Sequence, residues 1–193
     1  MTDAAWYAAR GTGLVALVML TVSVVLGIVV RSGRRPLGLH RFGITEVHRT
    51  ASMTACALIA VHVVSLLLDP YAQIRLLDTV VPFVAAYRPV WVGLGTVALE
   101  LLVAVIVTAV WRHWLGTRVF RTLHWATYLL WPVAFLHGIG SGSDRSTGWY
   151  LVTVVACALA VLCVLGWRTS ETFAVAPSRR SVSRPAPPRP RAS

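Results

Sequence analysis

Four histidines in apolar surroundings are the residues of this chain whose type and spacing could do chemistry. His48 and His62 lie fourteen positions apart in one apolar run, and His124 and His137 lie thirteen positions apart in another. An imidazole is costly to bury in lipid without a partner, so such a residue usually marks a functional site. Two pairs of near-equal spacing therefore predict two sites at which histidines meet across a helix bundle.

Axial ligation of haem iron is the chemistry that best fits two histidines at each of two depths. At 1.5 Å per residue, the members of each pair are about 20 Å apart along the helix axis. If the two helices run in parallel, His48 faces His124 at the inner depth and His62 faces His137 at the outer depth. We therefore expect two stacked b-type haems, held non-covalently because the chain has no C-x-x-C-H motif.

The angular spacing of the second pair fits this scheme less well. Fourteen residues of α-helix return to within about 40° of the starting face, whereas thirteen miss it by about 140°. Pro132 lies between His124 and His137 and is expected to kink the helix and re-aim one ring. Two alternatives stay open: structural hydrogen bonds between helices, or a metal or proton transporter whose path includes Glu100, a carboxylate in the middle of an apolar run.

The elements that must position these histidines are membrane-spanning helices. Hydrophobic residues make up 56% of the 193 residues and the mean hydropathy is +0.69, more apolar surface than a soluble domain could bury. The fold class is therefore all-α, an integral membrane helical bundle. Five apolar runs approach the roughly 20 residues that a span requires, and they cover residues 12–30, 47–68, 90–111, 122–139 and 149–167.

The expected domain organisation and orientation follow from the segments around these runs. Residues 1–11 would be a short outer N-terminus, residues 12–168 the haem-binding domain, and residues 169–193 a disordered basic tail rich in Pro, Arg and Ser. All eighteen basic residues are arginine; fourteen lie on the side of the C-terminus and four on the other. The positive-inside rule then places the N-terminus outside and the C-terminus inside. Arginines grouped between apolar runs indicate contact with membrane lipid and not with nucleic acid.

Several arginines are candidates for contacts with the haem propionates. The inner candidates are Arg41, Arg49 and Arg121, and the outer candidates are Arg88 and Arg145, with Arg75 and Ser141 beside them. For each arginine alone, a topology signal or a side chain that reaches to the interface is an equally good interpretation.

The histidine pattern resembles a known family, the ferric-reductase-like transmembrane domain. Its haem oxidases use the same two spacings, H-x13-H and H-x12-H, which here are His48–His62 and His124–His137. The segments RRPLGLHRFG, RTLHWATYLLWPVAFLHG and GSGSD are also similar to bacterial members, and the likeness covers about residues 11–168. The family includes NADPH oxidases, eukaryotic ferric reductases and the membrane subunit of bacterial methionine sulfoxide reductase systems.

The resemblance implies a two-haem cytochrome b that carries electrons across a bacterial cytoplasmic membrane. Larger members continue into a flavin- and nicotinamide-binding domain. None is expected here, because GIGSGSD at residues 138–144 follows no strand and is predicted to be an outer loop. The expected donor is a separate cytoplasmic flavoprotein or a quinol, and the acceptor is an outer one of unknown identity. A membrane assembly subunit without a cofactor is the remaining alternative.

Overall fold

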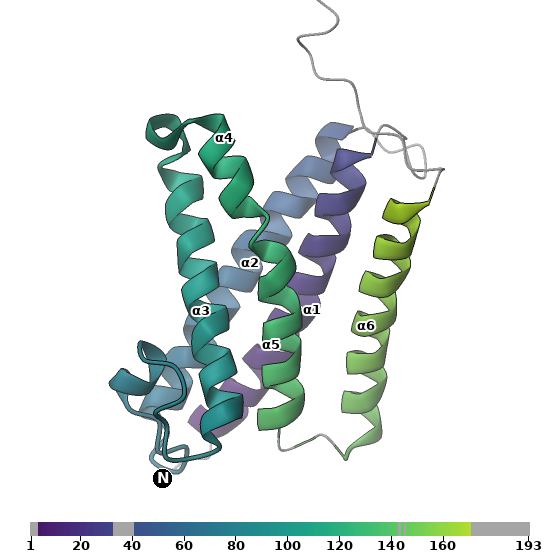
Figure 1. The fold of residues 1–193 in the computed structure, drawn as a ribbon. Coiled ribbons are helices and arrows are strands. Elements are labelled where there is room, and N and C mark those ends of the chain that lie inside the picture. Colours follow the sequence, from purple (N-terminus) through teal and green to yellow (C-terminus); the bar gives the residue numbers. More distant parts are fainter. Residues whose placement is uncertain (1–3, 33–40, 143, 145, 171–193) are drawn as a thin grey trace, which may run out of the picture.

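The computed structural model describes residues 4–32, 41–142, 144 and 146–170, and this part of the chain is helical without strands. Figure 1 shows a bundle whose helices follow one another up and down. The elements in chain order are α1 (Ala4–Arg31), α2 (Arg41–Leu68), η2 (Leu76–Thr79), α3 (Pro89–Val110), α4 (Arg112–His124), α5 (Thr127–Ser141) and α6 (Gly148–Thr169).

Four of these helices are long and apolar enough to cross a membrane: α1, α2 from Phe42 onward, α3 and α6. The expected starts of the second, third and fifth runs agree with them to within a few residues. The start of the first run does not, because α1 begins at Ala4 and includes most of the segment expected to be an outer N-terminus. Alanine-rich sequence favours helix there, and Arg10 is accommodated by an ion pair with Asp144. The predicted tail falls outside the described residues from residue 171 onward.

The remaining run, residues 122–139, is divided by the structure into two helices. α4 ends at His124 and α5 begins at Thr127, so α5 has 15 residues and is shorter than a spanning helix. Four amides around the junction each donate to the carbonyl three residues earlier: those of Trp125, Ala126, Tyr128 and Leu129. Bonds of this reach are those of a 3-10 helix, so the chain passes through a tightened turn.

The hydroxyl of Thr127 takes part in this junction. Its hydroxyl donates to the carbonyl of His124 at 2.7 Å, the acceptor that Tyr128 would use in an α-helix. A hydroxyl that competes with the backbone in this way distorts a helix. The distortion expected at Pro132 therefore lies earlier in the chain, while Pro132 itself sits inside α5.

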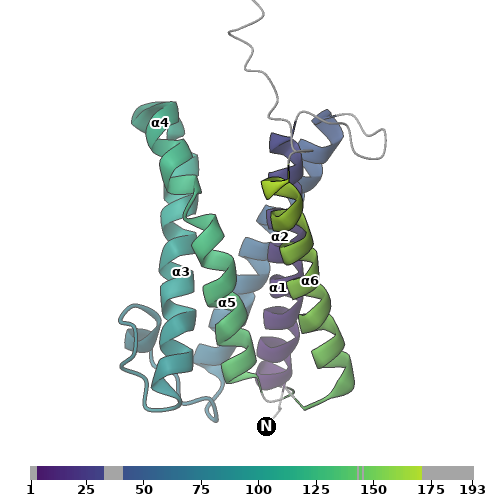
Figure 2. The ribbon, with the colours of Figure 1, turned by 45° about the vertical axis from the view of Figure 1, so that its right-hand side comes forward.

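Figures 1 and 2 show how the helices are grouped. α1 and α2 form a long antiparallel pair, α5 packs mainly on α3, and α6 packs on α1. α2 and α5 run in the same direction, as the pairing of the histidines requires. At the end of the bundle opposite the N-terminus, α4 leans away from α1 and α2 (Figure 2). α4 turns sharply at Gly116, whose φ of +76° is a left-handed conformation that glycine adopts without strain.

A buried cluster at mid-depth ties five helices together. Its members are Leu20, Ala55, Ala98, Leu102, Leu130, Trp131, Cys157 and Val161. The indole Nε1–H of Trp131 donates to the hydroxyl of Thr21 at 2.9 Å, which satisfies a polar group that would otherwise be buried alone. The cluster includes residues that line the floor of the cavity around His62: Leu20, Ala98, Leu102 and Leu130.

Candidate functional site

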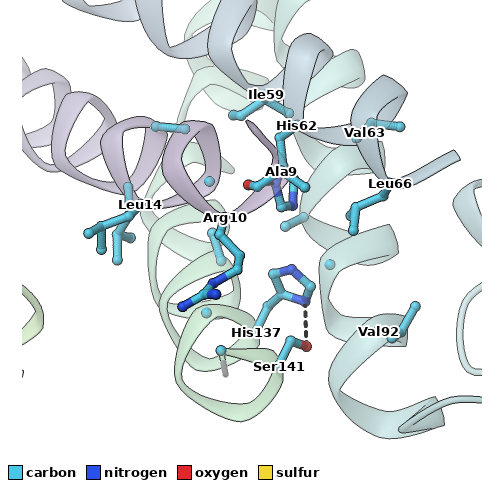
Figure 3. A pocket seen from close by; sticks show the side chains of 18 of the residues that line it. Ala9, Arg10, Leu14, Ile59, His62, Val63, Leu66, Val92, His137 and Ser141 are labelled. Carbon is cyan, nitrogen blue, oxygen red and sulfur yellow. Dashed lines mark hydrogen bonds between the residues drawn. The ribbon is translucent and has the colours of Figure 1, made fainter. Parts of the chain in front are cut away.

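The outer pair of histidines is brought face to face. His62 on α2 and His137 on α5 have ring centres 6.3 Å apart, with the ring planes at 79°. Figure 3 shows the two rings pointing toward one another across a cavity, with Arg10 beside them. The second histidine of each spaced pair, His62 and His137, therefore meets the other at this depth.

Each outer ring is fixed by a carbonyl oxygen on a neighbouring helix. Nδ1 of His62 donates to the carbonyl of Ala9 at 2.6 Å, and Nδ1 of His137 donates to that of Trp91 at 2.7 Å. Because a carbonyl only accepts, Nδ1 carries the proton and Nε2 keeps a lone pair. The neutral rings thus each offer one nitrogen for a metal.

The cavity around the outer pair measures about 440 Å³ and is lined mainly by apolar side chains of α1, α2, α3 and α5. Its polar residues lie at the outer end and include Arg10, Asp78, Ser141 and Asp144. An apolar slot with charged groups at one edge suits a porphyrin, whose propionates require a polar end. Two imidazoles bound on opposite sides of one iron, with bonds of about 2.0 Å, place their ring centres about 6 Å apart. The residues of the outer site therefore fit a haem with two histidine ligands.

The inner pair is arranged differently. Nδ1 of His48 donates to the carbonyl of Ser23 at 2.9 Å, as the outer rings do to theirs. Nδ1 of His124 is buried and has no hydrogen-bond partner in the described part of the chain, and its ring lies against Phe120. No ring contact between His48 and His124 is recorded among the described residues, in contrast to the outer pair.

The tightened turn between α4 and α5 changes the direction in which His124 points. A 3-10 helix turns about 120° per residue against about 100° for an α-helix. Overwinding of the five steps from His124 to Leu129 by about 20° each would remove about 100° of the 140° mismatch between His124 and His137. The re-aiming attributed to Pro132 therefore belongs to this segment, and Thr127 was its signal in the sequence.

Arg10 is a residue of the outer site that sequence reasoning missed. It was counted only as one of the outer arginines, yet it lines the cavity beside His62 and His137. One guanidinium nitrogen pairs with Asp144, Nε is buried without a partner in the described residues, and the group lies 3.9 Å from the ring centre of Trp6. Arg10 follows Ala9, whose carbonyl holds His62, and this tertiary contact is not visible in the sequence.

The arginines proposed from the sequence are placed less favourably. Arg88 donates to the carbonyl of Gly140 at 2.7 Å and so holds the end of α5. Arg75 pairs with Asp78 in the outer connection. Arg49 and Arg121 are exposed, whereas the side chain of Arg41 and the whole of Arg145 lie outside the described residues.

Two other expectations concern the outer end of α5 and the middle of α3. Residues 138–141, expected to be part of a loop, are the last turn of α5, where the hydroxyl of Tyr150 donates to the carbonyl of Gly138 at 2.8 Å. Ser141, a candidate for the outer haem, lies 3.4 Å from Nδ1 of His137. Glu100 is exposed on α3 and does not line the cavity around the outer pair.

In the described residues, no group of three or more His, Cys, Asp and Glu is arranged to hold a metal ion. A haem differs from a bare ion in this respect, because the porphyrin supplies four ligands and the protein supplies two.

Comparison with known proteins agrees with the family resemblance. Residues 12–135 match the family described as ferric reductase like transmembrane component. No curated protein and no solved structure matches the chain. The family is generally haem-binding, and its members usually act with cytoplasmic flavin or redox domains. The match covers well over half of a multi-pass, all-helical chain, and this protein therefore belongs to the ferric-reductase-like transmembrane family.

Proposed function

We propose that this protein is a two-haem membrane cytochrome b that carries electrons from a cytoplasmic donor to an acceptor on the outer side. The observation that supports this most directly is the outer pair, whose rings are 6.3 Å apart and keep Nε2 free. When bound, a haem supplies a one-electron carrier, and two histidine ligands leave its iron no open position for a substrate. The chain's own contribution is to space the carriers and to exclude water from them.

The inner site rests on His48 and His124. His48 is held by the same kind of carbonyl bond as the outer ligands, and the 3-10 turn brings His124 nearer to the face that carries His137. The buried cluster of Leu130 and Trp131 would fill the space between the two haems. A second haem at this depth completes a path from one side of the membrane to the other.

At the outer site Arg10 is the best-placed partner for a haem propionate. Its half-buried side chain already lines the cavity, and it is balanced by Asp144. The outer connection adds Asp78 and the end of α5 adds Ser141 to the lining of the cavity. An acceptor would approach through this polar end of the cavity, since the other walls are apolar.

The topology and direction follow from charge and length. Residues 122–141 together are long enough to complete a fifth span, which leaves fourteen arginines on one side and four on the other. The N-terminus is then outside, the C-terminus inside, and the His48–His124 site receives the electrons. We propose a separate flavoprotein or a quinol as donor, in keeping with the family's usual partners.

The experiment that tests this function is a haem assay of the purified chain. The pyridine haemochrome should give two b-type haems per chain, and the reduced-minus-oxidised spectrum should be that of a low-spin cytochrome b. A well-folded preparation without haem would overturn the proposal. Accessibility tags in the 69–88 connection should report the outer side; a cytoplasmic location would reverse the direction of flow.

A further inference from the structure

A glycine lies behind the ring of His62. The ring reaches the carbonyl of Ala9 on α1, and the residue four positions later on the same helix is Gly13. In an α-helix the carbonyl of one residue points toward the residue four positions on, so a side chain there would cover it. A Cβ added to Gly13 would lie only 2.9 Å from Cε1 and Nδ1 of His62.

The same arrangement recurs at the inner end of α1. His48 donates to the carbonyl of Ser23, and four positions later is Gly27, where an added Cβ would lie 3.3 Å from Cε1 of His48. Gly13 and Gly27 are fourteen residues apart, as are His48 and His62 on the antiparallel α2. Equal spacing on two antiparallel helices puts one glycine opposite each ring.

A third example of this arrangement of histidine, carbonyl and glycine lies between α3 and α5. His137 donates to the carbonyl of Trp91, and four positions later is Gly95. An added Cβ there would lie 2.6 Å from both Cε1 and Nδ1 of His137, closer than real Cβ atoms come. Three histidines on two helices thus use one geometry with three different partners.

His124 is the exception. Its Nδ1 is buried and has no partner in the described residues. α3, the helix on which α4 packs, has no glycine between residues 96 and 110. This stretch of α3 therefore lacks a glycine like those that follow Trp91 and Ala9 by four positions at the outer rings.

We infer that Gly13, Gly27 and Gly95 are positioning residues, each leaving bare a helix carbonyl that fixes one histidine by its Nδ1–H and so directs Nε2 to the haem. The outer site is fixed through both ligands and the inner site through His48 alone. This inference rests on the proposed function, since it assigns a role to residues around the two haems.

The chemical effect of such a bond is twofold. It selects the tautomer with Nε2 unprotonated, and it makes the imidazole a stronger donor, which stabilises the ferric state. Removing the bond therefore weakens haem binding and raises the midpoint potential of that haem. Loss of a partner of this kind commonly lowers metal affinity by about 10- to 100-fold.

The test is alanine substitution at the three glycines in the full chain, with the haem content, the potentials of both haems and the electron paramagnetic resonance of the ferric protein measured for each. Gly95→Ala should lose the outer haem and retain the inner one. Gly13→Ala should weaken the outer haem and raise its potential. Gly27→Ala, with the longest contact, should keep both haems and raise only the inner potential.

Two other glycines serve as controls. Gly11→Ala, two residues from Gly13 with nothing within 4 Å of the added Cβ, should leave both potentials unchanged. Gly93→Ala presses on Phe83 near Gly95 and not on a histidine, so it reports general damage to α3. If Gly95→Ala does not accumulate in membranes, the haem content and potentials of Gly13→Ala and Gly27→Ala decide whether the inference holds.

The outcomes separate the two proposals. A wild-type chain without haem defeats the proposed function itself. A wild-type chain with two haems, together with glycine variants whose haem content, potentials and resonance spectra equal those of Gly11→Ala, defeats only the inference. Loss of the outer haem in Gly93→Ala to the same extent as in Gly95→Ala would also defeat it.

Discussion

The outer and inner histidine pairs use the same residue type on the same two helical segments, α2 and α4–α5. The protein nevertheless supports the two pairs differently. Both outer rings donate to a helix carbonyl, at 2.6 and 2.7 Å. Of the inner rings, His48 does so, whereas the Nδ1 of His124 is buried alone within the described residues. The comparison teaches that spacing along a helix selects the ligands, but that the backbone of a neighbouring helix decides how firmly each is held.

The largest expected effect comes from removing a ring. His62→Ala or His137→Ala should abolish the outer haem and largely spare the inner one, because each haem needs both of its ligands. His48→Ala or His124→Ala should do the reverse. Haem content and a redox titration of each purified variant would check this, and loss of the same haem in the His48 and His137 variants would contradict the pairing.

A smaller effect, confined to the inner site, is expected from Thr127→Val. The change removes the hydroxyl that occupies the carbonyl of His124, so the 3-10 turn should relax toward an α-helix and rotate that ring away. Because one hydrogen bond contributes about 1 kcal/mol, the inner haem should bind about fivefold more weakly, while the affinity of the outer haem is unchanged.

The matched control for that variant is Thr153→Val, whose hydroxyl bonds to the carbonyl of Trp149 on the exposed side of α6. It should change neither haem. Haem retention during dilution in detergent measures the effect, and an equal loss of both haems from Thr127→Val would refute a local role for the turn.

A change between the two sites should affect them equally. Trp131→Phe removes the indole hydrogen bond to Thr21 in the mid-depth cluster, which should lower the free energy of unfolding by about 1 kcal/mol. Trp114→Phe is the control, because Trp114 is 90% exposed. Thermal unfolding followed at both haem signals would test this; destabilisation of one haem alone would mean that the cluster belongs to that site.

The smallest effect concerns the response of the outer connection to acid. The Arg75 side chain, hydrogen-bonded to Asp78, holds the pKa of that carboxyl below its ordinary value. A depressed pKa stabilises the folded connection above the ordinary aspartate pKa of about 3.9, and the contribution is lost as pH falls through the lower, folded value.

The protection of the amides of residues 69–88 against hydrogen exchange should therefore stay high from pH 7 down to about pH 4 and fall only below it. Asp78→Asn should exchange faster throughout this range, with a flatter dependence on pH. Glu46→Gln, at the inner end of α2, should behave as the wild type does. Opening of the connection between pH 6 and 5 in the wild type would show that another group controls it.

Much of the fold could be predicted because its signals are local. Four of the five apolar runs are long helices, and their ends lie near the expected residues, since hydropathy and length are properties of the segments themselves. The fourth run, residues 122–139, was wrong as a single helix, because the tightened turn between His124 and Thr127 depends on local backbone geometry and not on hydropathy. The start of α1 was missed because Arg10 reads as an interfacial charge until its partner, Asp144, is known.

The sequence by itself determined which residues are available as ligands and at what depths, because helical rise and hydropathy convert spacing along the chain into height in the membrane. Only the tertiary structure decided which nitrogen each ring keeps free. The acceptor of His62 lies 53 residues away on α1, and that of His137 lies 46 residues away on α3. Such a bond depends on two helix backbones approaching where a glycine leaves room, and that condition exists only once the helices have packed.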